Sequence, residues 1–411
     1  MPIYSYTFKD AVGGLQKGTT EAESEDQLRA RFSEQGLEIV EVTMLKKSGK
    51  SKSKSYGKVK LKNLAIFCRQ FSTMVDAGVS LVRCLDVLGR QTDDTKLKKI
   101  LMDVGERVES GESLSRAMQR HPRTFNNLFI GLIRAGEIGG VLEESLQRLS
   151  QFLEKDVELR RKVTSALTYP VLVLIAALGI VIFLVSWVVP QFAQLFKDIG
   201  LKDSEFPAMT KFLIDLSANF QKNWLVITLV TVGTIVVYKI FASTRFGRRV
   251  IDRVKLKVPV FGPLHHKVCM ARFSRTMGTL LTSGVPILQA METVAGTVGN
   301  AIMADAVLDA RARIREGDRI GEPLEASKQF PPMVVHMIGV GEESGSLDYM
   351  LQKIAEFYES EVEATLASLT AALEPILIVF LGFVVGFIVI AMFLPLIKVI
   401  EGLSGGEGFD E

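Results

Sequence analysis

Apolar residues gather in three runs without a charge, and each run predicts a membrane-spanning helix. The first covers residues 171–189, and the third, the longest, covers 375–397. At ~1.5 Å per residue the first makes a helix of about 28 Å, close to the ~30 Å of a bilayer's hydrocarbon core. The second run, 224–238, is shorter, but Lys239 after it can extend toward the headgroups. We therefore predict an integral membrane protein with transmembrane helices at 167–190, 224–241 and 374–397.

The charge around the second span indicates how the chain is oriented. Residues 190–223 hold four lysines and four acids, whereas residues 239–267 hold eight lysines or arginines and one acid. Basic segments stay on the cytoplasmic side, so the second of these segments is predicted to be cytoplasmic and the first to lie outside. The N-terminus lacks the charged-then-apolar order of a cleavable signal and is expected to remain in the cytoplasm. Three spans then put the tail, 398–411, outside.

Two glycine-rich phrases reveal an internal repeat. GLIRAGEIGG at 131–140 has a near-echo, HMIGVGEESG, at 336–345, and seven of 22 positions around them are identical at an offset of 205. Upstream, at an offset of 206, FCRQFSTMVDAGVSLVRCL lies over FSRTMGTLLTSGVPILQAM. If only the turn recurred by chance, the sequences on both sides of it would not be similar as well. The chain therefore contains two copies of a unit of about 130 residues. The offset of 205 also pairs the prolines around the spans, Pro170 with Pro375 and Pro190 with Pro395.

Each copy begins with a soluble part whose apolar spacing is helical. Leu64, Phe67, Phe71 and Met74 recur three or four positions apart, as on one face of a helix. Ser80 is expected to cap the helix that follows. The two soluble parts are predicted to be homologous cytoplasmic helical-bundle domains, at 61–166 and 268–373.

The repeated glycine-rich segment, at 131–140 and 336–345, is predicted to be a tight turn between two helices. Gly136, Gly139 and Gly140 interrupt the helical periodicity just before a long periodic segment. Leu142, and Leu347 in the second copy, are expected to open the helix that leads toward a span. Nothing breaks the first of these helices before the first apolar run, so it is expected to continue into the membrane.

The first 45 residues differ in kind from the rest of the chain. Short alternating β-branched segments flank a helical one, AESEDQLRARFSEQG, and predict a small cytoplasmic α+β module over 1–45. Residues 46–60 follow with seven lysines and four serines. This Lys/Ser segment is interpreted as a solvated linker, with a polybasic contact to anionic lipid as the alternative. Nucleic acid is not an expected partner, since this segment has one aromatic residue and no folded nucleic-acid-binding domain beside it.

A search for catalytic, cofactor or metal chemistry finds no complete constellation. The chain has no G-x-x-x-x-G-K-[ST], and Gly339 and Gly341 follow a helical pattern rather than a strand. His265, His266 and Cys269 share a helical turn, but no other cluster completes a zinc site. A formal G-x-S-x-G match lies in the glycine-rich tail without a following helix. We therefore expect no enzyme activity, no cofactor and no metal.

Two features of the third span bear on packing and polarity. Gly382 and Gly386 form a small-residue pair on which another helix can pack closely, although such a pair also occurs by chance. Glu374 comes directly before Pro375, and an acid there is costly in lipid. Glu374 is therefore expected to face protein, water or the interface.

The order of these parts resembles the inner-membrane platform proteins of type IV pilus assembly and type II secretion. The resemblance rests on the N-terminal module with its basic tether, the two helical domains, the three spans, and the paired turns AGVSL with SGVPI and AGEIGG with VGEESG. The module and the Lys-rich tether make the pilus-assembly branch the closer match. The resemblance implies a mostly α-helical protein of the bacterial inner membrane, with segment 191–223 and the C-terminal tail in the periplasm and a basic cytoplasmic connection at 242–267.

The resemblance also implies partners. In such a platform, the cytoplasmic domains dock on a hexameric assembly ATPase, and in retractile pili also on a retraction ATPase. ATPase movement is passed to pilin or pseudopilin subunits, beside other inner-membrane assembly proteins and further copies of the platform. The loops that are candidates for contact with the ATPase carry Arg134, Glu137, Glu342 and Glu343.

Two other classes of protein remain alternatives at this point. A small oligomeric transporter would use Glu374 as its coupling group, but three spans with so few polar positions are poor material for a pore. A membrane-anchored receptor would need a ligand domain, and the outside segments are too short to supply one. Within the resembled family, a platform of a type II secretion system is the alternative to one for a pilus.

Overall fold

The structure is a computed structural model that describes residues 3–9, 15–21, 38–45, 59–198 and 206–404. The chain divides into an N-terminal unit and a second unit, which holds Val59–Gln119 and Phe125–Glu411.

The N-terminal unit comprises Met1–Lys58 and Arg120–Thr124, and its described strands form an antiparallel sheet. Strand β1 (Ile3–Lys9) lies between β2 (Leu15–Glu21) and β3 (Glu38–Leu45), and its pairing with β3 shifts register between Thr7 and Phe8. The alternating segments expected for the α+β module are therefore strands. The helix expected between them lies outside the described residues.

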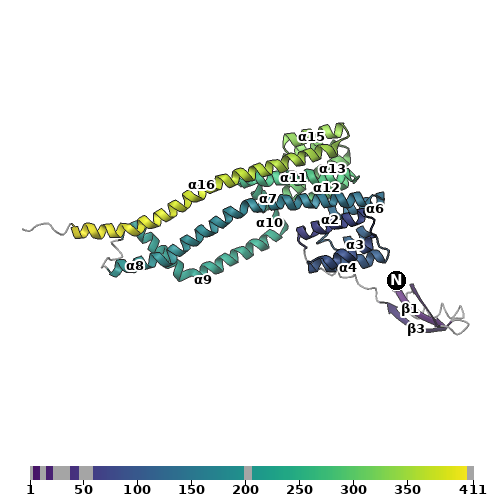
Figure 1. Ribbon diagram of the computed structural model, residues 1–411, viewed down its shortest axis with the longest axis horizontal. Helices are drawn as coiled ribbons and strands as arrows, with labels where there is room; N and C mark the ends of the chain where they lie inside the picture. Colours follow the sequence, from purple (N-terminus) through teal and green to yellow (C-terminus); the bar gives the residue numbers. More distant parts are fainter. Residues whose placement is uncertain (1–2, 10–14, 22–37, 46–58, 199–205, 405–411) are drawn as a thin grey trace, which may run out of the picture. The chain divides into compact units, whose positions relative to one another are not determined.

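The first repeat is a helical bundle (Figure 1). Its helices are α2 (Leu61–Asp76), α3 (Leu81–Gln91), α4 (Thr95–Glu109), α5 (Leu114–Gln119), α6 (Asn127–Gly139) and the first part of α7 (Leu142–Phe183). The apolar face predicted for the first helix is the one that is buried, since Leu64, Phe67 and Phe71 have almost no exposed surface. Helical spacing in the sequence thus reports the core of this bundle directly.

The starts of α4 and α6 are capped by the side chain of the residue before the helix, whereas the start of α3 is not. Asp94 accepts hydrogen bonds from the backbone N–H groups of Lys96 and Leu97 in α4, and Asn126 accepts one from the N–H of Phe129 in α6. Ser80 precedes α3, but its side chain makes no capping hydrogen bond, so the predicted role of its hydroxyl is wrong. The backbone carbonyl of Ser80 accepts the bond from Cys84 that begins the helix.

The second repeat has the same helices in the same order. They are α11 (Phe261–Thr282), α12 (Ile287–Thr297), α13 (Ala301–Glu316), α14 (Gly321–Ala326), α15 (Pro332–Glu343) and the first part of α16 (Leu347–Ser404). Gly78 and Gly284 end the first helix of each copy with φ of +79° and +76°. Only glycine adopts this left-handed conformation without a steric penalty, so the two copies share the same stop.

Two helices run from the soluble domains into the apolar segments. Helix α7 passes through Pro170 without a break, as predicted, and α16 passes through both Pro375 and Pro395. Helix α7 continues as a π-helical turn, η1 (Leu184–Val188), and then as α8 (Val189–Asp198). The three helical stretches long and apolar enough to cross a membrane, among the residues described, are Leu142–Asp198, Ala208–Ser243 and Leu347–Ile397.

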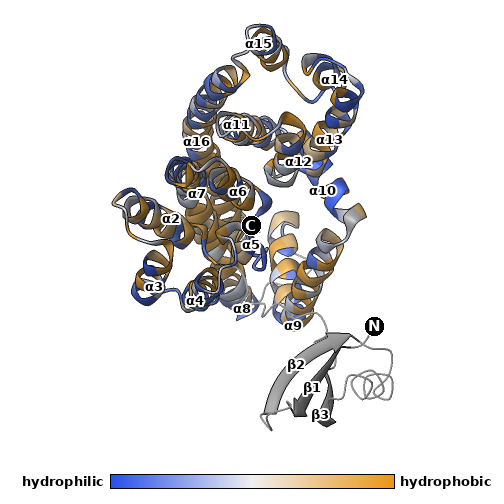
Figure 2. Ribbon diagram, turned by 90° about the vertical axis from the view of Figure 1, so that its right-hand side faces the viewer, coloured by the Kyte–Doolittle hydropathy of each residue, from blue (hydrophilic) through white to orange (hydrophobic). Residues whose placement is uncertain are grey.

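The connections around the second span are more helical than the sequence indicated. Residues 191–223, expected as a periplasmic loop, contain most of α8 and the first half of α9 (Ala208–Ser243), which has a kink at Asn223. Residues 242–267, expected as a basic connection, contain α10 (Arg245–Lys257) and the start of α11. Figure 2 shows α10 as a hydrophilic helix next to the largely hydrophobic α9.

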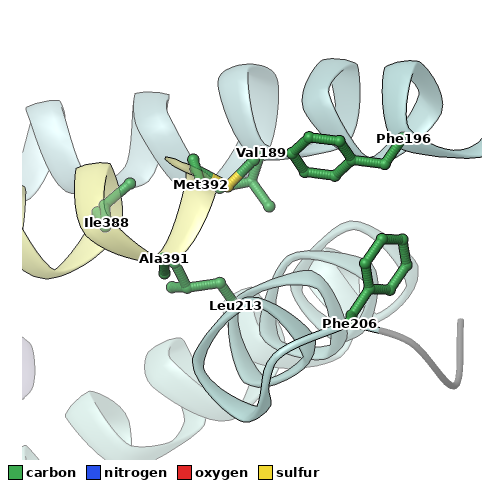
Figure 3. Packing of buried hydrophobic residues seen from close by; sticks show 7 residues of the cluster. All are labelled: Val189, Phe196, Phe206, Leu213, Ile388, Ala391 and Met392. Carbon is green, nitrogen blue, oxygen red and sulfur yellow. The ribbon is translucent and has the colours of Figure 1, made fainter. Parts of the chain in front are cut away.

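A small apolar cluster joins α8, α9 and α16 near the ends of the spans (Figure 3). Phe196 and Phe206 lie against each other with ring centroids 5.8 Å apart, beside Leu213 of α9 and Met392 of α16. The bilayer is as apolar as these side chains, so the cluster stabilises the joint through close packing rather than through exclusion of water.

Candidate functional site

The turn that ends α6 and α15 is shorter than the sequence indicated. Gly140 and Gly345 occupy it with φ of +69° and +68°, and Leu142 and Leu347 open the next helices, as predicted. Gly136, expected in the turn, instead lies inside α6. The periodicity stops there because the two helices cross too closely for a side chain.

Close approach of the two helices accounts for the glycine shared by the copies. A Cβ added at Gly136 would lie 2.6 Å from Ser145 Cβ and 3.0 Å from Leu142 Cα. At Gly341 the same addition would lie 2.9 Å from Leu347 Cα. We call the α6–α7 and α15–α16 corners the first and second tips.

The shared glutamate of each tip caps a neighbouring short helix. Glu137 accepts a hydrogen bond of 3.1 Å from the backbone N–H of Ser115 in α5, and Glu342 accepts one of 2.9 Å from Ile320, just before α14. A negative charge at a helix N-terminus is favourable because the first N–H groups there lack partners within the helix. The acid repeated in the sequence thus has a structural role in both copies.

The other two candidate residues point to a difference between the tips. Arg134 donates to Gln119 Oε1 at 3.1 Å in the first copy. In the second, Glu343 pairs with Arg319 at 3.1 Å, and both side chains are about 70% exposed, at 69% and 70%. The position of Glu343 is taken in the first copy by Ile138, which is 82% exposed. The first tip is therefore apolar at its outermost position and the second is charged.

An ion pair found in both repeats fixes the long helices to their bundles. Arg69 of α2 binds both carboxylate oxygens of Glu154 in α7, each at 2.7 Å. Arg275 of α11 binds Glu359 of α16 in the same two-pronged manner, at 2.9 and 2.8 Å. Paired parallel hydrogen bonds fix geometry as well as charge, so each long helix is held to its bundle near the middle of its soluble part.

The two repeats contact each other along α7 and α16. Lys162 of α7 bonds both Glu158 of its own helix and Glu363 of α16. Hydrogen bonds to Glu363 and then Glu158 raise the pKa of Lys162, and hydrogen bonds to Lys162 and then Lys155 lower the pKa of Glu158. Asp156 of α7 also faces Arg272 of α11 at 3.7 Å. A charged seam, made by these ion pairs, therefore joins the two copies just before the apolar segments.

A polar hollow of about 610 Å³ lies beside this seam. Its walls come from α7 of the first repeat and from α11 and α16 of the second, and include Arg148, Glu154, Lys155 and Arg275. Arg148 also donates to the backbone carbonyl of Thr282 across the two repeats. Each of these four charged side chains has a partner of opposite charge: Arg148 pairs with Glu144, Glu154 with Arg69, Lys155 with Glu158 and Arg275 with Glu359.

Prolines in the spans free backbone carbonyls, and neighbouring helices supply new donors. Proline has no N–H, so the carbonyl four residues before it loses its partner within the helix. For Pro395 this carbonyl belongs to Ala391, and the buried hydroxyl of Thr210 in α9 donates to it. For Pro190 it belongs to Ser186, which accepts from Gln221 Nε2 at 2.7 Å. Within a bilayer no water is present to make these bonds.

Two further backbone carbonyls, one in α7 and one in η1, also accept hydrogen bonds from side chains of neighbouring helices. Ser217 of α9 donates to Val185 in the π-helical turn at 2.6 Å. The hydroxyl of Thr370 in α16 lies 3.5 Å from the carbonyl of Ala166, which Pro170 frees, and 2.9 Å from that of Leu366. The Thr370 proton is shared, and this is the weakest of the four contacts.

The polar and glycine candidates of the third span lie on surface that is open in this chain. Glu374 is exposed on α16, one residue before Pro375. A Cβ at Gly382 or Gly386 would meet nothing within 4 Å. At 100° per residue this glycine face lies opposite Ala391, which packs in the cluster of Figure 3.

The histidines and cysteine beside α10 serve in packing. His266 Nε2 lies 2.7 Å from the carbonyl of Gln329, and His265 Nε2 lies 3.3 Å from the Asn300 amide. Burial raises the pKa of Cys269 to about 12, so its thiol stays protonated. No group of three His, Cys, Asp or Glu side chains is placed to hold a metal ion in the part of the chain that the structure describes.

The residues that sequence reasoning missed are the partners in non-local contacts: Arg69, Arg275, Thr210 and Gln221. The repeat offered a signal for the first two, since an Arg and a Glu recur together at offsets of 206 and 205. Thr210 and Gln221 lie in the segment expected as a loop, so nothing in the sequence connected them with a proline in another helix.

Comparison with known proteins finds matches over the whole length of the chain. The family model described as "Type II secretion system (T2SS), protein F" matches residues 67–190 and again 273–395, and that of its N-terminal domain matches residues 1–43. The double match confirms the internal repeat.

Curated relatives carry names from two systems. The "Type IV pilus assembly protein PilC" of Thermus thermophilus is 44% identical over 98% of this chain and 100% of its own length, and that of Myxococcus xanthus is 42% identical over 94% and 93%. The "Type II secretion system protein F" of Vibrio cholerae is 32% identical over 97% of this chain and 98% of its own.

Proposed function

Because this chain belongs to the type II secretion system protein F family, whose members are inner-membrane platform proteins, we propose that it couples a cytoplasmic assembly ATPase to insertion of pilin subunits into a growing type IV pilus. Its similarity to relatives named for pilus assembly exceeds its similarity to those named for secretion. The second candidate, a platform of a type II secretion system, rests on the latter relatives.

The observation that carries the proposal is the continuity of α7 and α16. Helix α7 runs without a break from the first tip to the first span, and from Leu142 to residue 167 it covers about 37 Å at 1.5 Å per residue. A helix clamped by the Arg69–Glu154 pair moves as one body. Displacement of a tip by a motor would therefore reach the apolar segments without loss in a flexible loop.

The proposed orientation follows the charge bias. The N-terminal module, both repeats and α10 lie in the cytoplasm, and the α8–α9 connection and the C-terminal tail lie in the periplasm. The tips then point away from the membrane toward the ATPase, and the joint of α8, α9 and α16 lies at the periplasmic side, where a pilin leaves the bilayer.

The ATPase is proposed to bind the first tip through Ile138 and Val141, with Arg134 at its rim. Ile138 is 82% exposed and Val141 is 47% exposed, although neither lies in a span. Exposed apolar residues of this size, ringed by polar ones, are the usual centre of a protein interface. Glu343 would offer a retraction ATPase or another assembly protein a charged contact at the second tip, while Glu137 and Glu342 shape the tips.

Binding to the ATPase tests this assignment. Full-length protein in nanodiscs is expected to bind the assembly ATPase encoded in the same genome, and Ile138→Asp is expected to weaken binding about tenfold or more. Ile66→Asp, on an exposed face of α2, is the matched control and should bind as the parent does. Equal binding by all three proteins would remove the first tip from the interface.

Complementation distinguishes the two systems. In a strain that lacks this gene, the parent protein is expected to restore surface pili and leave protein secretion unchanged. Restored secretion without pili would overturn the pilus assignment and favour the second candidate.

The open face of Gly382 and Gly386 is proposed to pack against a second copy or another inner-membrane assembly protein. Small residues allow helix backbones to approach closely in lipid. Gly382→Ile is expected to shift the chain from oligomer to monomer in crosslinking of native membranes, and Gly233→Ile, a glycine of α9 that also faces open space, serves as the control.

A further inference from the structure

A pocket of about 510 Å³ lies where α7 enters the membrane and α10 joins α11. One wall is apolar and includes Val163, Val258, Leu264 and Val268. The other carries three cations, Arg160, Lys255 and Arg272. Arg272, which faces Asp156 at the seam, is shared with the features described above, whereas the other residues of this pocket have no part in the tips, the seam or the proline contacts.

The position of the pocket puts it at the membrane surface. Arg160 and Val163 on α7 are within two helical turns of residue 167, where the first span is predicted to begin, and α10 starts two residues after the second span's helix ends at Ser243. At 1.5 Å per residue, the pocket lies within about 10 Å of the apolar segment. In the proposed orientation, lipid headgroups rather than bulk water would therefore surround the pocket.

Helix α10 has the pattern of a helix that lies in the membrane interface. Phe246, Val250 and Val254 follow one another at spacings of four and are all exposed. Arg249, Arg253 and Lys257 flank this stripe and are exposed as well. An apolar stripe bordered by cations is typical of helices whose apolar face enters the headgroup region of an anionic membrane.

The backbone on both sides of α10 is built for close corners. A Cβ at Gly247 would collide with the carbonyl of Phe241, and one at Gly262 with that of Leu256. Between α10 and α11, Val260 has φ of +71° and ψ of −52°, and the N–H of Phe261 bonds the carbonyl of Pro259 at 2.8 Å. A β-branched residue in this γ-turn is strained, and the turn leaves Val258 before it and Phe261 after it in the lining of the pocket.

The charges around the pocket sum to an excess of positive charge. Asp156 pairs with Arg160 at 2.9 Å and faces Arg272, and Asp252 pairs with Lys255 at 3.0 Å. Asp252 also accepts the N–H of Ala301. Burial lowers the pKa of His265, which adds no charge at neutral pH. Three cations against two acids, beside the basic face of α10, leave the pocket attractive to an anion.

We infer that this pocket binds an anionic phospholipid of the inner leaflet, with its phosphate between Arg160 and Lys255 and the start of an acyl chain along Val163, Val258 and Val268. A phosphate alone would satisfy only the cationic wall, whereas a phospholipid also covers the apolar wall. The lipid would connect α7 of the first repeat with α10 and with α11, the first helix of the second repeat, at the level of the headgroups. Each cation near an anionic headgroup contributes about 1 kcal/mol, a factor of about five in affinity.

Native mass spectrometry of the full-length protein in detergent tests the site. Phosphatidylglycerol is expected to bind about fivefold or more better than phosphatidylcholine of the same chain length. Lys255→Gln is expected to reduce the phosphatidylglycerol adduct about fivefold, while Lys257→Gln, on the same helix but outside the pocket, changes it less than about twofold. Val268→Phe fills the apolar wall and is expected to reduce binding of both lipids.

Several outcomes would overturn the inference. Equal binding of the two lipids would remove the anionic preference, and equal losses in the two lysine variants would show diffuse attraction to α10 instead of a pocket. Competition of inorganic phosphate with the lipid at similar concentrations would make this a phosphate site. Should Val268→Phe fail to fold, the two lysine variants, which replace exposed side chains, still decide the matter.

Discussion

The two repeats share their internal contacts and differ at their tips. Glu137 and Glu342 cap the same short helix, and Gly136 and Gly341 allow the same close crossing. At the outermost position, however, the first tip has Ile138 and the second has Glu343. The two copies have thus kept the capping glutamate and the crossing glycine that their fold requires, and they differ in the exposed residue that a partner would contact. A molecule with one apolar and one charged tip is suited to two different partners, or to two faces of one partner.

The largest expected effect tests whether the shared glycine is structural. Gly136→Ala places a methyl group against Ser145 and against the Cα of Leu142, and overpacking of this kind costs about 1–3 kcal/mol. The midpoint of thermal unfolding of the detergent-solubilised protein should fall accordingly. Gly131→Ala on the same helix meets nothing within 4 Å and should leave the midpoint unchanged or raise it.

Gly341→Ala extends this test to the second copy. The nearest atoms are Leu347 Cα at 2.9 Å and the side chain of Met350 at 3.1 Å. The closest of these distances is longer than the 2.6 Å from a Cβ at Gly136 to Ser145 Cβ, so the loss should have the same sign and be smaller. A larger loss than for Gly136→Ala would contradict the view that the first crossing is the tighter one.

The repeated ion pair should be worth more in the second copy. Arg275 and Glu359 are 20% and 21% exposed, against 56% and 37% for Arg69 and Glu154. Removing one partner of a less exposed pair leaves a charge without compensation, so Arg275→Ala should cost more than about 1 kcal/mol and Arg69→Ala less. Chemical unfolding of each variant measures this, and a reversed order would show that burial does not decide the strength of this pair.

The capping glutamates should have equal effects in the two repeats. Glu137→Ala and Glu342→Ala each remove an acceptor at a helix start, at about 1 kcal/mol. Hydrogen exchange of α5 and of α14 should accelerate in the corresponding variant only. If Glu137→Ala left exchange unchanged but abolished ATPase binding, its carboxylate would belong to the interface instead.

The smallest effect is expected at the seam between the repeats, and it depends on pH. The pKa of Glu158 is lowered from 4.5, so its contribution is present above pH 4.5 and is lost as the pH falls through the lowered value. The pKa of Lys162 is raised from 10.5, so its contribution is present below pH 10.5 and is lost above the raised value. These side chains are partly exposed, so Lys162→Met should change stability at pH 7 by less than about 1 kcal/mol. A loss that is equal at pH 7 and pH 3 would exclude the seam as its cause.

Local and repeated features of this fold could be predicted from sequence. The uncharged runs gave the long apolar helices, and the offset of 205 gave the duplicated bundle, because each depends on neighbours along the chain. Leu142 and Leu347 were placed correctly as first helical residues for the same reason. Gly136 was misplaced because a helical glycine packed against another helix breaks the apolar pattern as a turn does.

Contacts between distant segments could not be predicted in this way. The partner of Ser186 is Gln221, and that of Ala391 is Thr210, and both donors lie in a segment with no strong pattern of its own. The capping by Glu137 also depends on α5 folding back beside α6. Such pairs are determined by tertiary packing, which a single sequence does not record.

The prolines of the spans change where bending energy is stored. A helix ordinarily resists bending because its own backbone hydrogen bonds must stretch. At Pro190 and Pro395, however, the carbonyl four residues earlier accepts its hydrogen bond from a side chain of α9 instead. Bending there and sliding against α9 become a single motion, resisted by one hydrogen bond to a side chain that can change its rotamer. The molecule can thus bend most easily at the proline-containing ends of the spans, whereas the long helices are held rigidly to their bundles by ion pairs. In mechanical terms it is a stiff lever whose flexible part lies at the pivot.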